Sequence, residues 1–208
     1  MKFFVAALCI FFFGACNETR DAPLKAKKEE NKDSGLLKKE LANPYSPTDV
    51  SPLDISYFPP DYPVLKMSNP ETGPPVARVI YSRPHRQGRN IFGNLLQYNQ
   101  PWRLGANEAT EIEFFQPVLI QNKKIKKGSY IIYCIPQQTL WTIILNNSIY
   151  SWGLKIDPKK DVYTFEVPVQ ELEKPIEYFT LVFQPAANGA NLIMAWDKVQ
   201  VRLPIIPE

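Results

Sequence analysis

Arginine and tryptophan side chains that could hold a ligand are concentrated in a few short parts of the sequence. Between residues 83 and 103 the chain carries four arginines and one tryptophan, together with several asparagines and glutamines. A guanidinium group presents a planar fork of N–H donors, which suits a carboxylate or a phosphate. These residue types predict a pocket in which tryptophans stack on a sugar ring or a similar ligand, while arginine, asparagine and acidic groups bond its polar edge.

The candidate binding residues allow two interpretations. They are Arg83, Arg89, Trp102, Arg103, Asn107, Glu108, Trp152, Trp196 and Asp197. In the first interpretation they line a ligand site. In the second, Arg103 pairs with Glu108, or Arg83 with Asp197, in an ion-pair network that fixes a long loop against the end of the fold. Buried arginines are normally paired, so the sequence leaves both interpretations open.

Catalytic chemistry has fewer residues to use. His85 is the only histidine, and no serine lies in a recognisable nucleophile turn, so a histidine-dependent triad would depend on this one residue. The histidine and cysteine counts exclude a metal site built from those ligands, and we expect no metal and no cofactor. The remaining catalytic alternative is a carboxylate pair, Glu108 with Asp197, acting as acid and base on a glycan. We expect a binding protein rather than an enzyme.

The elements that must position these residues have the pattern of β-strands. Apolar residues alternate with polar ones, as in "TEIEFF", where Ile112 and Phe114 share one face, and short turns separate the runs. The pattern predicts a single antiparallel β-sandwich or flattened barrel. The expected strands lie within residues 76–82, 110–115, 118–136 (with a turn near Asn122), 140–147, 161–169, 177–183 and 190–203.

Two irregular segments flank the first of these strands. Residues 83–110 are expected to form a long ordered loop, because Pro84 and Pro101 restrict its backbone and four apolar residues could anchor it: Phe92, Leu95, Leu96 and Trp102. Gly88, Gly93 and Gly105 would allow positive φ angles where the loop turns. Residues 43–75 are rich in proline but also in aromatic residues, which predicts an extended strap that buries Tyr57, Phe58 and Tyr62 against the domain.

The first residues predict export and a lipid anchor. Lys2 precedes an apolar run, and Gly14 and Ala15 stand directly before Cys16, an arrangement that resembles the signal of bacterial lipoproteins. An ordinary signal peptide is the alternative. We therefore expect a signal at 1–15, a lipidated Cys16 with a charged tether at 16–45, and a β domain at 46–208. Cys134 is then the one remaining thiol, expected to be a small buried residue.

The order of several motifs resembles one known family. "YSRPHRQGRNIFG", "PWRLGANEATEIEF", "GSYIIYCIP", "WTIILN", "SWG" and "AWDKVQVRLP" together resemble the DUF2911 family, bacterial domains of unknown function. The resemblance covers roughly residues 51–204 and implies an all-β domain in a secreted or lipid-anchored protein, without an assigned activity. Function must therefore be argued from the site.

These observations predict a lipid-anchored protein of the cell envelope, with the outer membrane favoured. Its expected task is to bind a small polar ligand, a glycan or a protein partner, and its predicted membrane contact is the lipid. A carboxylate-dependent glycan hydrolase and a purely structural envelope lipoprotein are the alternatives. Nucleic acid is not an expected partner, because the net charge is only +3 and the basic residues are interspersed with acids.

Overall fold

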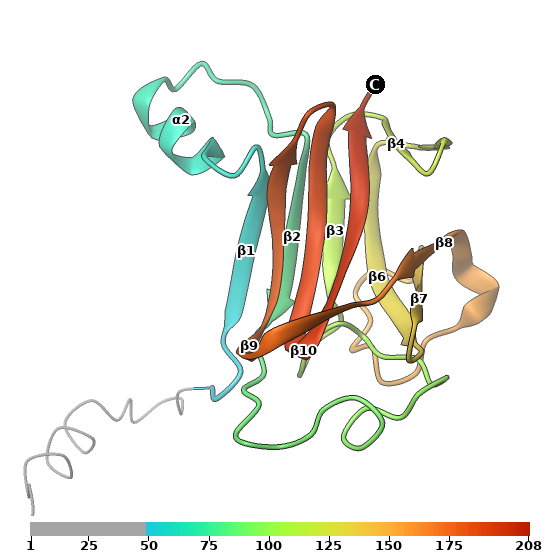
Figure 1. Cartoon of the computed structure of the whole chain (residues 1–208). Helices are drawn as coiled ribbons and strands as arrows, with labels where there is room; N and C mark the ends of the chain where they lie inside the picture. The colour runs from blue at the N-terminus through green and yellow to red at the C-terminus, as the bar shows by residue number, and fades with distance from the viewer. Residues whose placement is uncertain (1–48) are drawn as a thin grey trace, which may run out of the picture. The chain divides into compact units, whose positions relative to one another are not determined.

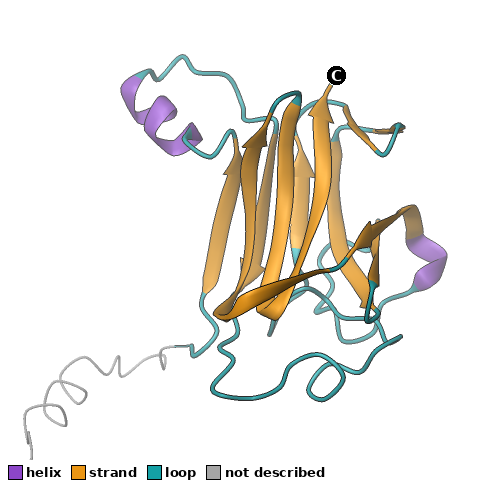
Figure 2. Ribbon diagram, viewed as in Figure 1, coloured by secondary structure: helices purple, strands orange, loops and turns teal. Residues whose placement is uncertain are grey.

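Ten strands in two antiparallel sheets make up most of residues 49–208, which are the residues that the computed structural model describes (Figure 1, Figure 2). The six-stranded sheet has the order β1-β2-β3-β6-β7-β8, and the four-stranded sheet has the order β5-β4-β10-β9. The predicted all-β sandwich is thereby confirmed. The signal, Cys16 and the tether of residues 16–45 lie outside the described residues and stay predictions. Within residues 49–208, no helix combines the length and the apolar character that crossing a membrane requires.

The strands agree closely with the alternating runs of the sequence. Their bounds are Leu53–Phe58 (β1), Ala77–Ser82 (β2), Glu111–Phe114 (β3), Val118–Ile120 (β4), Lys123–Ile125 (β5), Gly128–Pro136 (β6), Leu140–Asn146 (β7), Asp161–Pro168 (β8), Gln170–Ala186 (β9) and Gly189–Pro207 (β10). A seven-residue helix, α2 (Tyr62–Ser68), and a short 3-10 turn at Pro158–Lys160 complete the elements.

The core lies between the inward faces of the two sheets. In β3, Ile112 and Phe114 are fully buried, whereas the two glutamates of that strand point to the other face. Phe179 and Leu181 of β9 are buried from the opposite sheet. Burying one such side chain contributes about 2 kcal/mol to stability, so period-two alternation is enough to fix which face of each strand packs inward.

Cys134 belongs to this core. It lies in β6, the strand that runs through the middle of the larger sheet, and its side chain is fully buried. Burial raises the pKa of the Cys134 thiol well above its ordinary value, because the thiolate would lose its hydration. The prediction of a small buried residue is confirmed, and this thiol is not activated for chemistry.

The proline-rich strap differs in part from the prediction. Leu53–Phe58 is extended as expected and pairs antiparallel with β2, and the buried Phe58 ring stacks 6.0 Å from that of Phe183. Tyr62–Ser68 is helical, however, and α2 buries none of its residues. Pro63 lies in the first turn of this helix, where the missing N–H costs nothing, so the residue that suggested an extended chain is compatible with helix. Figure 1 shows α2 projecting beyond the end of β1.

The loop of residues 83–110 is tied to both sheets by backbone hydrogen bonds. Trp102 exchanges N–H···O bonds of 2.7 and 2.9 Å with Cys134 of β6, and the Arg86 N–H donates to Glu177 of β9 over 2.7 Å. Ile91 and Leu104 are fully buried and anchor the loop, together with Trp102, while Leu95 is 46% exposed and does not. The predicted ordered loop is therefore present, with two anchors that the sequence did not single out.

Gly105 is needed for space rather than for a positive φ angle. The φ angle of Gly105 is not positive, whereas those of Gly88 and Gly93 are 70° and 82°. A Cβ atom at Gly105 would lie 3.1 Å from the Ser82 carbonyl oxygen and 3.3 Å from the Thr110 hydroxyl oxygen. A side chain at this position would therefore push the loop away from the end of β2.

Candidate functional site

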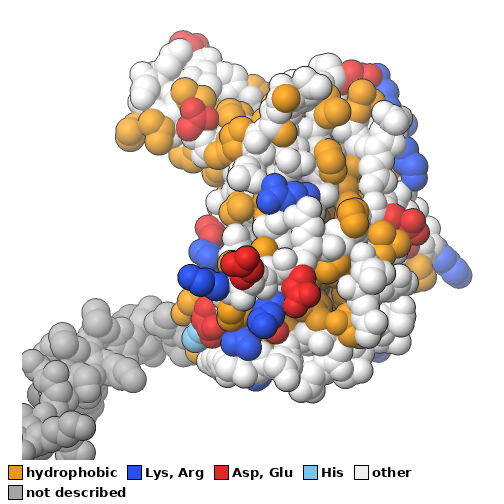
Figure 3. All heavy atoms as spheres, in the orientation of Figure 1, with side chains coloured by type: hydrophobic (Ala, Val, Ile, Leu, Met, Phe, Trp, Pro, Cys, Tyr) orange, Lys and Arg blue, Asp and Glu red, His pale blue; other side chains and the backbone are white. Residues whose placement is uncertain are grey.

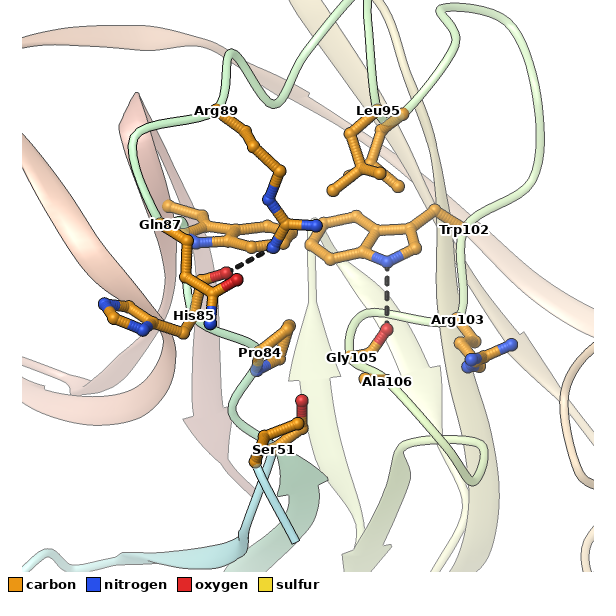
Figure 4. Close-up of a pocket in the computed structure, with 13 residues that line it drawn as sticks. Ser51, Pro84, His85, Gln87, Arg89, Leu95, Trp102, Arg103, Gly105 and Ala106 are labelled. Atoms are coloured by element: carbon orange, nitrogen blue, oxygen red, sulfur yellow. Dashed lines mark hydrogen bonds between the residues drawn. The ribbon is translucent and has the colours of Figure 1, made fainter.

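A cavity of about 440 Å³ lies between the 83–110 loop and the end of the sandwich (Figure 4). Its size falls within the range of roughly 300–1,000 Å³ typical of small-molecule pockets. Three parts of the chain line it: the start of the domain at Val50 and Ser51, the loop from Pro84 to Ala106, and Trp196 of β10. The cavity thus contains four of the predicted binding residues, namely Arg89, Trp102, Arg103 and Trp196.

Two tryptophans give the cavity a rigid apolar wall. The rings of Trp102 and Trp196 stack with centroids 5.8 Å apart, and Trp102 also packs edge-on against Phe179 at 4.9 Å. Both indole N–H groups are already used inside the protein. That of Trp102 donates to the Gly105 carbonyl over 3.1 Å, and that of Trp196 to the Glu177 carbonyl over 3.3 Å. The indoles are 7% and 2% exposed, so what they offer a ligand is the small carbon surface that the core leaves uncovered.

Two of the four loop arginines are paired with acids. Arg83 Nη1 lies 3.1 Å from Asp54 Oδ2, and Arg86 Nε lies 2.8 Å from Asp197 Oδ1. The predicted pairs were Arg83 with Asp197 and Arg103 with Glu108, and both are wrong. Arg83 directly follows β2. The neighbouring strand β1 carries Asp54, so its carboxylate lies within reach of Arg83.

Asp197 is directed to Arg86 by an irregularity in β10. The register between β9 and β10 shifts on both sides of Asp197, and its φ angle is 52°. Such a bulge re-aims a side chain relative to the regular pleat. The carboxylate pairs with Arg86 through one oxygen, while its Oδ2 accepts the Ile91 N–H over 3.3 Å. Asp197 thereby fastens the loop to the sheet.

His85 and Glu177 form a second fastening at the edge of the cavity. His85 Nε2 lies 2.9 Å from Glu177 Oε1, and the imidazole stacks on Tyr178 with ring centroids 4.4 Å apart. The same carboxylate accepts the Gln87 N–H over 3.0 Å and lies 4.0 Å from Arg86. Figure 3 shows basic and acidic side chains gathered on this part of the surface, next to the one histidine.

Arg89 and Arg103 line the cavity without a carboxylate partner among residues 49–208. Arg89 is held by its own loop, since its Nε donates to the Arg86 carbonyl over 2.8 Å and its Nη2 to the His85 carbonyl over 2.5 Å. Arg103 has no hydrogen bond to any described residue, and its Nε is shielded from solvent. Burial lowers the pKa of Arg103, with no acid to offset that effect.

The other predicted residues lie outside this cavity. Glu108 and Trp152 line a second cavity of about 380 Å³, together with Glu111 and Tyr150. The Asn107 amide donates to the Asp49 carboxylate, and Arg83 lines a separate hollow with Pro52 and Tyr178. Glu108 and Asp197, the possible catalytic pair, are not brought together, because Asp197 lines neither the first nor the second cavity.

Gly153 joins the region of the second cavity to Arg103. Its φ angle is +78°, and a Cβ atom there would lie 2.9 Å from Ala109 Cβ and 3.1 Å from Arg103 Cδ. The "SWG" motif thus packs directly on the "WRLGANEAT" motif, and the missing side chain leaves the room that the Arg103 stem occupies. The two motifs were predicted to contribute to one binding site, and they instead line neighbouring cavities.

Several contributors to the cavity were missed by sequence reasoning. Val50 and Ser51 line it, although they lie in the proline-rich strap, and Asp54 and Glu177 supply the carboxylates that pair with Arg83 and His85. One signal was available. "LDISYF" alternates like a strand, which would have placed Asp54 beside the end of β2. Nothing in the sequence indicated that the start of the domain would reach the 83–110 loop.

Comparison with known proteins gives a family and no activity. A family model described as "Protein of unknown function (DUF2911)" matches residues 66–205. This range contains the whole 83–110 loop and both cavity tryptophans, while Val50 and Ser51 precede it. No curated protein and no solved structure matches the chain. Among residues 49–208, no three histidine, cysteine, aspartate or glutamate side chains are grouped so that they could hold a metal ion.

Proposed function

The chain belongs to the DUF2911 family, and we propose that it is a binding module that takes a small ligand into the cavity beneath the 83–110 loop. One observation carries this proposal. The cavity is preformed, and its lining combines apolar residues, including the edges of two core tryptophans, with two arginines that no described carboxylate neutralises. Pockets that combine an apolar wall with a few convergent polar groups are the usual sites of small-molecule binding.

The contrast within the loop supports binding over a purely structural role. Arg83 and Arg86 do what an ion-pair network requires, because each meets a carboxylate from a strand. Arg89 and Arg103 add positive charge to the same loop without such a partner. Arg103 is partly buried, and a network that served only stability would not leave such a charge unpaired, because an unpaired buried charge is destabilising. Arg89 is exposed and carries no such cost.

The hydrolase alternative has no observation in its favour. Glu108 lines the second cavity beside Glu111, whereas Asp197 is engaged by Arg86 and by the Ile91 N–H. Acid–base cleavage of a glycosidic bond needs two carboxyl groups on either side of the same bond, roughly 5–10 Å apart. Binding is therefore the function that the geometry supports best.

The test uses the four tryptophans as reporters. In NMR spectra of the unlipidated chain (residues 17–208), each indole N–H gives one signal, and small-molecule fragments are screened for shifts. Fragments in the cavity move the signals of Trp102 and Trp196 and leave that of Trp152 in place. Ala106→Phe, which fills the cavity, should abolish these shifts, and Ala187→Phe in the exposed β9–β10 turn should not. If no fragment moves Trp102 or Trp196, the proposal fails.

The proposal also includes the place where the protein works. We propose that Cys16 carries lipid and holds the domain at the cell envelope, with the outer membrane favoured. Two or more acyl chains give stable anchoring. Cys16→Ser should lose label from a fatty-acid analogue and leave the membrane fraction. Equal labelling of both proteins would show that Cys16 is not the lipid attachment site.

A further inference from the structure

The charges around the cavity are unbalanced. Its lining residues include Arg89, Arg103 and His85 and no aspartate or glutamate. Three acids of the surrounding strands are paired: Asp54 with Arg83, Asp197 with Arg86, and Glu177 with His85. Asp49, next to the cavity, accepts the Ser51 N–H and the Asn107 amide. A concave site lined by one sign of charge concentrates ligands of the opposite sign. The cavity therefore favours a ligand that brings its own negative charge.

Arg89 is oriented and still has donors to spare. A guanidinium has five N–H donors, and Arg89 uses Nε and one Nη2 bond on the carbonyls of its own loop. Those two bonds fix the plane of the group, while Nη1 makes no hydrogen bond to a described residue. Figure 4 shows the Arg89 guanidinium and the Trp102 indole pointing into the same space. An arginine fixed in this way loses little side-chain entropy when it binds an anion.

Arg103 provides a second and more strongly desolvated charge. Its Nε is shielded and has no hydrogen-bond partner among residues 49–208, and burial lowers its pKa. Two other arginine Nε atoms are equally shielded, those of Arg78 and Arg86, but each lies within 2.9 Å of a carboxylate oxygen. Arg103 is thus the shielded arginine that lacks a counter-ion within the described chain. In the view of Figure 4 it stands on the opposite side of Trp102 from Arg89.

The remaining wall requires an apolar part in the same ligand. The indole N–H groups of Trp102 and Trp196 are already satisfied, so these rings present carbon only. Leu95 and Leu96 also line the cavity, and Leu95 leaves 46% of its surface uncovered by the protein. A bare inorganic anion would leave this surface unused.

We infer that the natural ligand is an amphiphilic organic acid, whose carboxylate or phosphate is bound by Arg89 while its ring or apolar chain lies against Trp102 and Leu95. Arg103 adds positive charge from the other side of Trp102. This inference rests on the proposed binding function and adds the chemical class of the ligand. Guanidinium groups bind both anions through paired, charge-assisted hydrogen bonds, so either headgroup fits the site.

The experiment compares acids with their neutral amides on the unlipidated chain. Phenylacetate and phenylacetamide have nearly the same shape and differ in charge, and indole-3-acetate with its amide forms a second pair. Benzyl phosphate separates a preference for phosphate from one for carboxylate. The dissociation constants are measured from the indole N–H signals of Trp102 and Trp196. We expect each acid to bind roughly tenfold more tightly than its amide, the factor that one charge-assisted hydrogen bond contributes.

Charge-removing variants locate the effect. Arg89→Gln with Arg103→Gln should bring the acids to the affinity of the amides and leave the amides unchanged. Arg202→Gln removes one positive charge from exposed β10, where Arg202 bonds only glutamines, and should change neither. If the double variant misfolds, the salt dependence of binding to the wild type decides instead. Raising the salt concentration should weaken binding of the acids and leave binding of the amides unchanged.

Each failure has its own signature. Acids and amides that shift Trp102 and Trp196 with equal affinity would overturn the anion inference and leave the cavity a ligand site. Acids that move only Trp152 would overturn it too, because they would occupy the second cavity. The binding function itself would be overturned if no acid, amide or screened fragment shifted the indole signals of Trp102 and Trp196.

Discussion

Two pairs of arginines in one loop have opposite surroundings. Arg83 and Arg86 lie 3.1 and 2.8 Å from the carboxylates of Asp54 and Asp197, whereas Arg89 and Arg103 meet no carboxylate among residues 49–208 and line a cavity. The question of whether this arginine-rich loop is structural or functional therefore has a different answer for each pair. Residue type alone did not separate them, and only the position of the neighbouring strands did.

The two cavities show a second contrast. The first is lined by Arg89, Arg103 and His85 without an acid, and the second by Glu108 and Glu111 without a basic residue. The "WRLGANEAT" segment contributes to both, and Gly153 packs against it beside Arg103. Neighbouring residues of one motif thus face different chemical environments, so the residues of this motif cannot all be assigned to one site.

The largest effect is expected where an ion pair is well buried. The side chains of Arg86 and Asp197 are 20% and 15% exposed, so Arg86→Ala leaves a poorly hydrated carboxylate without its partner. We expect a loss of about 3 kcal/mol in the free energy of unfolding, the lower end for a buried pair. Urea denaturation measures this value. A loss below about 1 kcal/mol would mean that Arg86 does not belong to a stabilising network.

Gly153→Ala tests the support of Arg103. The added Cβ meets Ala109 and the Arg103 stem, and the φ angle of +78° is strained for alanine. We expect a loss of about 2 kcal/mol. Gly73→Ala is the matched control, because no atom lies within 4 Å of its Cβ position. If both variants melt at the same temperature, the space and the φ angle at Gly153 do not require a glycine.

Arg83→Ala should have a smaller effect than Arg86→Ala. The Arg83 and Asp54 side chains are 36% and 40% exposed, so water screens the pair and hydrates either partner when the other is removed. We expect a loss of at most about 1 kcal/mol in the free energy of unfolding. A double-mutant cycle with Asp54→Asn isolates the pair energy. A coupling above about 2 kcal/mol would contradict the assignment of this pair to the exposed rim.

The sequence predicted the strands better than the site, for a physical reason. Alternation is local, so the burial of Ile112 and Phe114 could be predicted from six residues, and the family blocks located Trp102, Arg103 and Trp196. Charge pairing is not local. Asp54 reaches Arg83 only because β1 adds to the edge of β2, and Asp197 reaches Arg86 only because β10 is irregular there. Helix α2 was missed because the prolines and aromatics of residues 43–75 suggested an extended strap, although Pro63 suits a first helical turn.

The most direct measurement compares two double variants without any ligand present. Arg89→Ala with Arg103→Ala should change the free energy of unfolding by no more than about 0.5 kcal/mol, and a small gain is acceptable, because ligand-binding residues often reduce stability. Arg83→Ala with Arg86→Ala should lose about 3–4 kcal/mol, the sum of the two separate losses. Urea midpoints of both variants give the comparison. A loss of about 3 kcal/mol or more in the free energy of unfolding of the first variant would contradict the account, because Arg89 and Arg103 would then stabilise the fold rather than serve ligand binding.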